Sequence, residues 1–346
     1  MTKPPPASSS AAEQGSSTNR PPTLTDVARE AKVSSATVSR FLNNPGVVAE
    51  ETGARIRAAI ELTGYIPNAL AGDLASSKSR MVAVLIPHLE HSLFNDMIER
   101  MVGEMTASGN NVMIGLTGTS RDRTDSLVRA ALARRVDAII STGPASEAVD
   151  SMVARSRTLF IQVWELPEEP VGIAIGFSHE DAGRDIARFL ASRGYQRPHL
   201  VTADSPRAQA RKQGFFTEWQ ALGHAAPSES IVDMPTRFGH ARRVFADIRR
   251  MDERPDVVVC GSDHLAQGLI VEAQAAGLRV PDDLGVLGFG NNAISGEMRP
   301  TITSVDVDGA RIAREVMAAI ARHQEGKDFL SRKIDVGFRL IARESV

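Results

Sequence analysis

A short hydroxyl-rich segment near the N-terminus carries side chains that suit contact with nucleic acid. It reads Ser35-Ala36-Thr37-Val38-Ser39-Arg40-Phe41-Leu42. If this segment is helical, Val38, Phe41 and Leu42 face inward, so the hydroxyls, Ala36 and Arg40 face outward. Hydroxyls bind phosphate oxygens, an arginine reads guanine or clamps a phosphate, and an alanine methyl packs on thymine. The segment therefore predicts a recognition helix for the major groove of DNA.

Two further helices are needed to hold this segment in place. Thr23 with Asp26 is a helix start signal, and apolar residues follow it at helical spacing (Leu24, Val27, Ala28 and Ala31). The run Asn43-Asn44-Pro45-Gly46 ends the second helix, and a third helix is expected from about Glu50 to Gly64. Residues 22–64 therefore predict a helix-turn-helix unit, although an ordinary three-helix bundle has the same pattern.

From Met81 onward, short β-branched runs alternate with longer amphipathic stretches. The predicted strands are MVAVLIP, NVMIGL, AIIS, LFIQVW and GIAIGF, followed after residue 180 by HLVTA, DVVVCG, LGVLGF, TITSV and a last strand near IDVGFRLI. Such alternation predicts parallel sheets covered by helices, and it is too long for one sheet. We therefore expect an α/β core of two doubly wound lobes, with a ligand crevice between them at the carboxyl ends of the strands.

Composition narrows the class of protein further. Hydrophobic residues make up 42% of the chain and charged residues 24%, which supports a packed core. The single cysteine, Cys260, excludes a disulfide within the chain, and no apolar run approaches the ~18 residues of a membrane span. The N-terminus lacks the apolar stretch of a signal peptide, so we expect a cytoplasmic protein without a membrane partner. Because the net charge is −2, any attraction to DNA must come from how the charges are arranged.

The runs TLTDVAREAKVSSATVSRFLNN and GYIPNALAGDLASS resemble the headpiece and linker of the LacI/GalR family of repressors, and the likeness continues through the core. The runs SRFLNNP, LIPHLEHSLF and AIGFSHEDAGR look most like the gluconate and ketogluconate repressors of that family. The resemblance implies a headpiece that binds a pseudo-palindromic operator. It also implies a core like that of periplasmic binding proteins, which senses a small metabolite.

The resemblance also implies an arrangement of domains. We expect a disordered tail (1–21), a helix-turn-helix headpiece (22–66), a hinge helix or linker (67–79) and a two-lobed core (80–346). Lobe 1 would comprise about 80–178 and 307–333, and lobe 2 about 179–306 and 334–346. The chain ends without a tetramerising leucine-heptad tail, so a homodimer is expected and a tetramer stays an alternative.

DNA contacts are implied position by position. Ser35 and Ala36 would be the main base readers, and Arg40 would also reach DNA. Phosphate-contact or capping positions fall on Thr23, Ser34, Thr37, Ser39 and Asn43. In the hinge, Asn68 would contact DNA and Leu74 would wedge into the minor groove and kink it.

Three residues depart from the family pattern. Lys32 replaces the usual glycine in the turn, where a positive φ is expected. Ala49 replaces the usual serine before the third helix, and Asp73 places an acid close to DNA. Together these departures predict a lower affinity or an unusual operator.

The effector would bind between the two lobes. Arg211, in an Arg-x-x-Gly-Phe run, would be its main cationic partner, and Asp263 would accept hydrogen bonds from it and orient Arg211. The remaining contacts would come from His88, Ser92, Phe94, Ser178, Phe238 and Asn291. Ser178 and Asn291 stand where many relatives carry acids, so this pocket is less acidic than average. An arginine in such a pocket favours a sugar acid, such as gluconate or a ketogluconate, although neutral sugars and nucleobases also use an Arg/Asp pair.

We find no catalytic constellation and no metal site in the sequence. His88 and His91 lack companions at metal-ligand spacing, and the adjacent Ser262, Asp263 and His264 do not by their adjacency form a triad. We therefore expect neither an enzyme nor a cofactor. A sugar-binding transport receptor shares the core fold and is the alternative, although the headpiece and the missing signal peptide argue against it.

Overall fold

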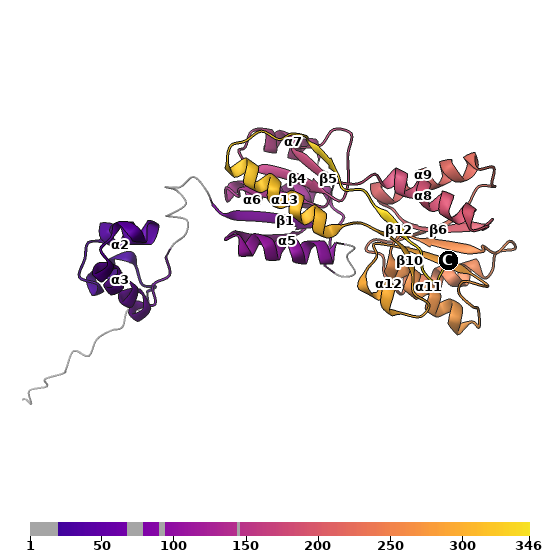
Figure 1. Cartoon of the computed structure of the whole chain (residues 1–346), viewed down its shortest axis with the longest axis horizontal. Helices are drawn as coiled ribbons and strands as arrows, with labels where there is room; N and C mark the ends of the chain where they lie inside the picture. Colours follow the sequence, from indigo (N-terminus) through magenta and orange to yellow (C-terminus); the bar gives the residue numbers. More distant parts are fainter. Residues whose placement is uncertain (1–19, 68–78, 90–93, 144–145) are drawn as a thin grey trace, which may run out of the picture. The chain divides into compact units, whose positions relative to one another are not determined.

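The structure is a computed structural model that describes residues 20–67, 79–89, 94–143 and 146–346. The chain forms two compact units, Met1–Ser79 and Arg80–Val346. Each unit is described here by itself (Figure 1). Asn68, Asp73, Leu74 and Ser92 lie outside the described residues, as does most of the expected tail.

The N-terminal unit is a small helical domain. Its helices are α1 (Leu24–Glu30), α2 (Ser35–Asn43), the 3₁₀ turn η1 (Pro45–Val47) and α3 (Glu50–Thr63). Val27, Val38 and Ile56 are fully buried, one from each α-helix, and they lie in a single apolar cluster. Gly53 lets α3 approach α2 closely, because a Cβ at that position would lie 2.9 Å from the Phe41 ring. The expected three-helix arrangement is confirmed.

Lobe 1 of the core is built on a parallel sheet. Its strands within the described residues follow the order β11-β5-β4-β3-β1-β2 and are β1 (Met81–Ile86), β2 (Asn111–Leu116), β3 (Ala138–Ser141), β4 (Leu159–Val163), β5 (Ile173–Gly176) and β11 (Lys333–Asp335). All of the pairings are parallel. The helices of this lobe are α5 (Asn95–Ala107), α6 (Arg121–Ala133), α7 (Glu147–Ala154) and α13 (Gly309–Gln324). Because helices cover both faces, strands such as β1 are buried and read as continuous apolar runs.

Lobe 2 repeats this architecture. Its strand order is β12-β10-β9-β8-β6-β7, comprising β6 (Pro198–Ala203), β7 (Ser228–Val232), β8 (Val257–Cys260), β9 (Gly285–Phe289), β10 (Thr303–Asp306) and β12 (Arg339–Ile341). The last strand, β12, runs antiparallel to β10, and the others are parallel. The helices are α8 (His179–Ser192), α9 (Pro206–Ala221), α10 (His240–Ile248), α11 (Asp263–Ala275) and α12 (Ala293–Glu297). Together, the two lobes confirm the predicted fold class.

Two details differ from the sequence prediction. The single strand expected near IDVGFRLI is two strands in different sheets, because Gly337 turns the chain between them with a φ of 67°. The expected lobe boundary after residue 333 therefore cuts through β11, which stays in lobe 1 through Asp335. Strand β7 was not predicted, because it lies at a sheet edge and most of its side chains are not buried.

Candidate functional site

The surface of α2 carries the residues that the sequence assigned to DNA contact. Ser34 caps the helix by accepting a hydrogen bond from the Thr37 amide at 3.1 Å, and its hydroxyl lies 2.8 Å from that of Thr37. Ala36 and Arg40 are exposed, whereas Val38 and Phe41 point into the domain core. Within the described part of the chain, the Arg40 guanidinium takes part in no hydrogen bond or ion pair. The outward face of α2 is therefore free for a ligand.

The flanking positions are arranged to hold that face. Thr23 begins α1 with a reciprocal cap, in which its amide and hydroxyl donate to Asp26 Oδ2 at 2.9 and 2.7 Å. Asn43 at the end of α2 donates to the Ser39 hydroxyl at 3.5 Å. Lys32 takes a φ of 54° in the turn between α1 and α2, as its replacement of a glycine predicted. Ala49 begins α3 without a side-chain cap, which is the consequence of replacing serine.

A cavity of about 250 Å³ lies between the two lobes of the core, at the carboxyl ends of their strands. Three of the residues that the sequence assigned to the effector line this cavity, namely His88, Phe94 and Arg211. Its other lining groups include hydroxyls of lobe 1 (Thr117, Thr119, Ser120, Thr124 and Thr142), the pair Trp164 and Glu165, and the start of α9 (Asp204, Ser205, Arg207). We refer to this cavity as the cleft.

Four predicted effector residues do not line the cleft, and the polar groups of three of them bond to other parts of the protein. Ser178 caps α8 by accepting from the Asp181 amide at 3.1 Å. Asn291 donates to Asp306 Oδ1 at 3.0 Å and accepts from Arg343 at 2.6 Å. Phe238 is half-buried just before α10 and also lies outside the lining.

Asp263 is the fourth of these residues, and it is fully buried at the start of α11. Its carboxylate accepts hydrogen bonds from the Ser304 hydroxyl at 2.6 Å and the Asn292 amide at 2.7 Å. Burial raises the pKa of this carboxyl, whereas these hydrogen bonds lower it. Asp263 therefore ties α11 to strand β10 and to the loop before α12, and it does not orient Arg211 as expected.

Arg211 is held in the cleft by neutral groups. Its Nη1 donates to His179 Nδ1 at 3.0 Å, and its guanidinium lies 4.1 Å from the centre of the Phe289 ring. An arginine can only donate, so Nδ1 must be the acceptor and the histidine carries its proton on Nε2. That nitrogen lies 3.0 Å from the Trp164 carbonyl, to which it donates. Burial, followed by the charges of Arg211 and Arg207, keeps the pKa of His179 well below its usual value, which agrees with a neutral ring.

Arg211 has no carboxylate partner among the described residues. Burial, and then the charge of Arg207, lower the pKa of its guanidinium to about 9. Burial and the charge of Arg207 therefore destabilise the charged form of Arg211, and a nearby anion would stabilise it. Arg207 itself pairs with Glu165 at 2.9 Å, so its charge is already neutralised. Among the two arginines of α9 that line the cleft, Arg211 is consequently the one available to a ligand.

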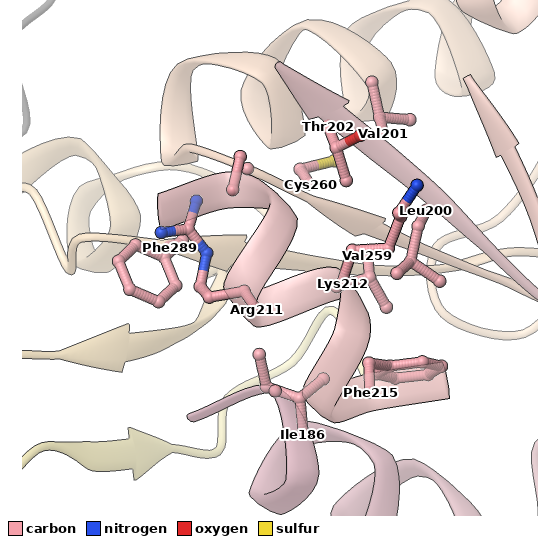
Figure 2. Close-up of a pocket in the computed structure, with 13 residues that line it drawn as sticks. Ile186, Leu200, Val201, Thr202, Arg211, Lys212, Phe215, Val259, Cys260 and Phe289 are labelled. Atoms are coloured by element: carbon pink, nitrogen blue, oxygen red, sulfur yellow. The ribbon is translucent and has the colours of Figure 1, made fainter. Parts of the chain in front are cut away.

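Behind Arg211 lies a second, much smaller cavity of about 30 Å³, inside lobe 2 (Figure 2). Arg211 and Phe289 lie side by side in this view, and Thr202 and Cys260 line another part of the cavity. The Thr202 hydroxyl has no hydrogen-bond partner among the described residues. Burial raises the pKa of the Cys260 thiol, so the thiol stays protonated. The space is large enough for one water molecule but not for an effector.

Sequence reasoning missed several residues of the cleft. Arg207 lies four residues before Arg211 in a stretch of helix, so the two side chains share a face, and that spacing could have revealed it. Trp164 and Glu165 follow the end of β4. They turn into the cleft because Trp164 has a φ of 75°, and no sequence pattern predicts a positive φ at a tryptophan. No cluster of three or more metal-ligating side chains exists in the described residues. None of the described helices has the length and apolar character to cross a membrane.

Comparison with known proteins agrees with this geometry. Residues 23–68 match the bacterial regulatory proteins of the lacI family, and residues 187–346 match a periplasmic binding protein-like domain. The HTH-type transcriptional regulator GntR of Pseudomonas aeruginosa is 33% identical over 94% of this chain and 95% of its own length.

Solved structures give the same result. A LacI family transcriptional regulator from Silicibacter pomeroyi superposes with a TM-score of 0.87 at 25% identity, covering 94% of this chain and 99% of the other. The transcription regulator GntR from Chromobacterium violaceum superposes with a TM-score of 0.71 at 27% identity, covering 77% and 98% of the two chains. The match of the headpiece disfavours a transport receptor. The chain therefore belongs to the LacI family of bacterial regulatory proteins, and it is a DNA-binding transcription regulator and not an enzyme.

Proposed function

We propose that the chain is a repressor whose affinity for its operator is controlled by a sugar acid bound in the cleft. The observation that carries the proposal is the Arg211 guanidinium, which lies in the cleft without a carboxylate partner. A carboxylate fits its planar fork of donors with two parallel hydrogen bonds. Gluconate and the ketogluconates have this carboxylate.

The rest of the cleft suits the remaining atoms of a sugar acid. The hydroxyls of Thr117, Ser120 and Thr142 line the lobe 1 side, where they can exchange hydrogen bonds with sugar hydroxyls. Trp164 and Phe94 add apolar surface for the carbon chain. Their rings pack edge to face, with ring centres 5.1 Å apart. Among the charged residues that line the cleft, Arg121, Arg207 and Arg211 outnumber Asp204 and Glu165, which favours an anion.

Operator binding is assigned to the headpiece. Ser35, Ala36 and Arg40 would meet base edges, while Thr23, Ser34, Thr37, Ser39 and Asn43 would contact phosphates or hold the helix ends. Asn68 and Leu74 would act in the hinge. We further propose a homodimer on a pseudo-palindromic operator, because the two-fold symmetry of a dimer matches the two half-sites. Effector binding changes operator affinity only if the two states of the core bind the effector with different affinities.

A thermal-shift screen tests the effector class. A ligand that binds only the native state raises the melting temperature, so the protein is heated with sugar acids, neutral sugars and nucleobases. We expect a rise with gluconate or a ketogluconate. A rise with only a neutral sugar or a purine would overturn the sugar-acid proposal and leave the regulator standing.

A further inference from the structure

An ion pair joins the two lobes across the cleft. Arg207 on α9 of lobe 2 donates through Nε to Glu165 Oε2 of lobe 1 at 2.9 Å. Both side chains are mostly buried, with 16% and 15% of their surfaces exposed. The Arg207 guanidinium also lies 5.5 Å from the centre of the Phe94 ring, which belongs to lobe 1. The second arginine of the cleft is therefore paired with a carboxylate of the protein itself.

The backbone is built to place that carboxylate. Trp164, the residue before Glu165, takes a φ of 75°, a left-handed conformation that costs a residue with a side chain roughly 1–2 kcal/mol. Hydrogen bonds hold it there, because its amide donates to the Ile175 carbonyl at 2.9 Å and its carbonyl accepts from His179. Gly176 leaves room for this turn, since a Cβ at that position would overlap the Glu165 backbone. Glu165 is thus fixed in the cleft and is not a freely moving surface acid.

The side chains of Arg207 and Arg211 lie close together in the cleft. They lie one helical turn apart on α9, and both line the cleft. The charge of Arg207 lowers the pKa of Arg211, which means that the two guanidiniums are close enough to repel. An anion that binds Arg211 therefore also attracts Arg207, and it competes there with Glu165. A neutral ligand offers Arg207 no charge in exchange for Glu165.

We propose that Glu165 is a specificity-determining residue. Its carboxylate lies beside Arg207, in the place that the carboxylate of a ligand would take. An anionic ligand replaces it and releases the ion pair between the lobes, whereas a neutral ligand leaves the pair intact. The cleft thus distinguishes the charge of its ligand through a change in the contact between the lobes. The choice of ligand in the first test rests on the proposed function, and the second test does not.

The first test compares two variants that remove the same charge from the same loop. Glu165→Gln breaks the ion pair, and Glu169→Gln changes an exposed acid four residues later. Titration calorimetry with gluconate and with glucose measures both affinities in the full chain. We expect Glu165→Gln to bind gluconate about three- to tenfold tighter, since gluconate no longer competes with a mostly buried ion pair, and we expect the affinity for glucose to stay unchanged.

Three outcomes of this titration would overturn the proposal. An equal gain for gluconate and glucose would mean that Glu165 only restricts opening of the cleft. A loss of gluconate affinity would show that Glu165 contacts the ligand. Equal effects of the two variants would show that Glu165 acts only through its charge at a distance. If the wild-type chain binds neither compound, the sugar-acid proposal fails, and the second test then decides the role of Glu165.

The second test needs no effector. Hydrogen exchange is followed in peptides that cover residues 159–177, in the free chain and in sodium acetate or sodium chloride of equal ionic strength. We expect faster exchange in Glu165→Gln than in Glu169→Gln, because the lobes lose their ion pair. Acetate should speed exchange in the wild type more than chloride does, because a carboxylate fits Arg207. Unchanged exchange in Glu165→Gln, or equal effects of the two salts, would contradict the proposal.

Discussion

At the scale of single residues, two histidines show how hydrogen bonding decides what a titratable group does. His179 is kept neutral so that one ring nitrogen can accept from Arg211 while the other donates to the Trp164 carbonyl. If the ring were protonated, both nitrogens would become donors and the contact with Arg211 would be lost. His199 lies outside the cleft, and burial lowers its pKa and keeps its ring neutral. Its ring nitrogens lie 2.8 and 2.9 Å from the hydroxyls of Ser228 and Ser230.

His199 predicts a pH dependence of stability. Burial lowers its pKa from 6.5 to about 4 in the folded protein. Below pH 6.5, His199 binds a proton in the unfolded chain but stays neutral in the folded chain. The free energy of unfolding therefore falls as the pH drops towards 4. His199 should contribute about 2 kcal/mol to the loss between neutral pH and pH ~5, measured by urea unfolding, and His179 adds a further loss of the same sign.

The matched variants for this prediction are His199→Gln and His240→Gln. Replacing His199 should remove that part of the pH dependence, whereas replacing the more exposed His240 should keep it. Both variants retain the carboxylates that titrate at lower pH, so the difference between them isolates one ring. An identical pH dependence in the two variants would show that His199 does not titrate as its burial requires.

At the scale of elements, the turn between α1 and α2 stands out, because a lysine occupies a glycine position. Lys32 has a φ of 54°, which costs a side-chain-bearing residue more than a glycine. Lys32→Gly should therefore stabilise the headpiece by about 0.5–1 kcal/mol, with Lys32→Ala close to the wild type. Hydrogen exchange across residues 24–63 measures this effect. Slower exchange in Lys32→Ala than in Lys32→Gly would contradict the argument.

The recognition surface of α2 yields the second prediction at this scale. Arg40 is exposed and its neighbours Val38 and Phe41 hold the core, so Arg40→Ala should leave the helix folded. Loss of one good base contact costs about 1–3 kcal/mol, so operator affinity should fall at least ~5-fold. The operator is first obtained by selecting bound sequences from a random DNA pool. Arg243→Ala, which removes an exposed arginine of α10, is the control, and an equal effect of both variants would refute the docking of α2.

At the scale of the whole molecule, the fold could be predicted from the sequence because hydrophobic periodicity reports burial directly. Strand β1 is buried on both faces, so its sequence is an apolar run that predicts a strand. The edge strand β7 is mostly not buried, so its sequence has no such run and it was not predicted. The site was harder to predict, because a polar side chain near the carboxyl end of a sheet can point to the cleft or bond within its own lobe. Arg211 on α9 points to the cleft, while Asp263 at the start of α11 bonds to strand β10 and to the loop before α12. That choice depends on three-dimensional contacts, which sequence spacing does not record.

The chain crosses between the two lobes of the core more than once. It passes from β5 to α8, from β10 to α13 and from β11 to β12, all within described residues, so the cleft is bordered by several connections and is not closed by one hinge. Small changes at the Arg207–Glu165 pair can therefore alter the relation of whole lobes. A ligand acts on this relation by the difference between its affinities for the two states.

We propose that Arg211 makes the regulator responsive to a sugar acid. This role is tested by the fluorescence anisotropy of labelled operator bound to the full chain, titrated with gluconate and with glucose, for the wild type and Arg211→Gln. We expect gluconate to change operator affinity in the wild type and glucose to leave it unchanged, whereas Arg211→Gln should bind the operator normally but no longer respond. A gluconate response that survives in Arg211→Gln, or a wild type that responds to glucose alone, would contradict this proposal.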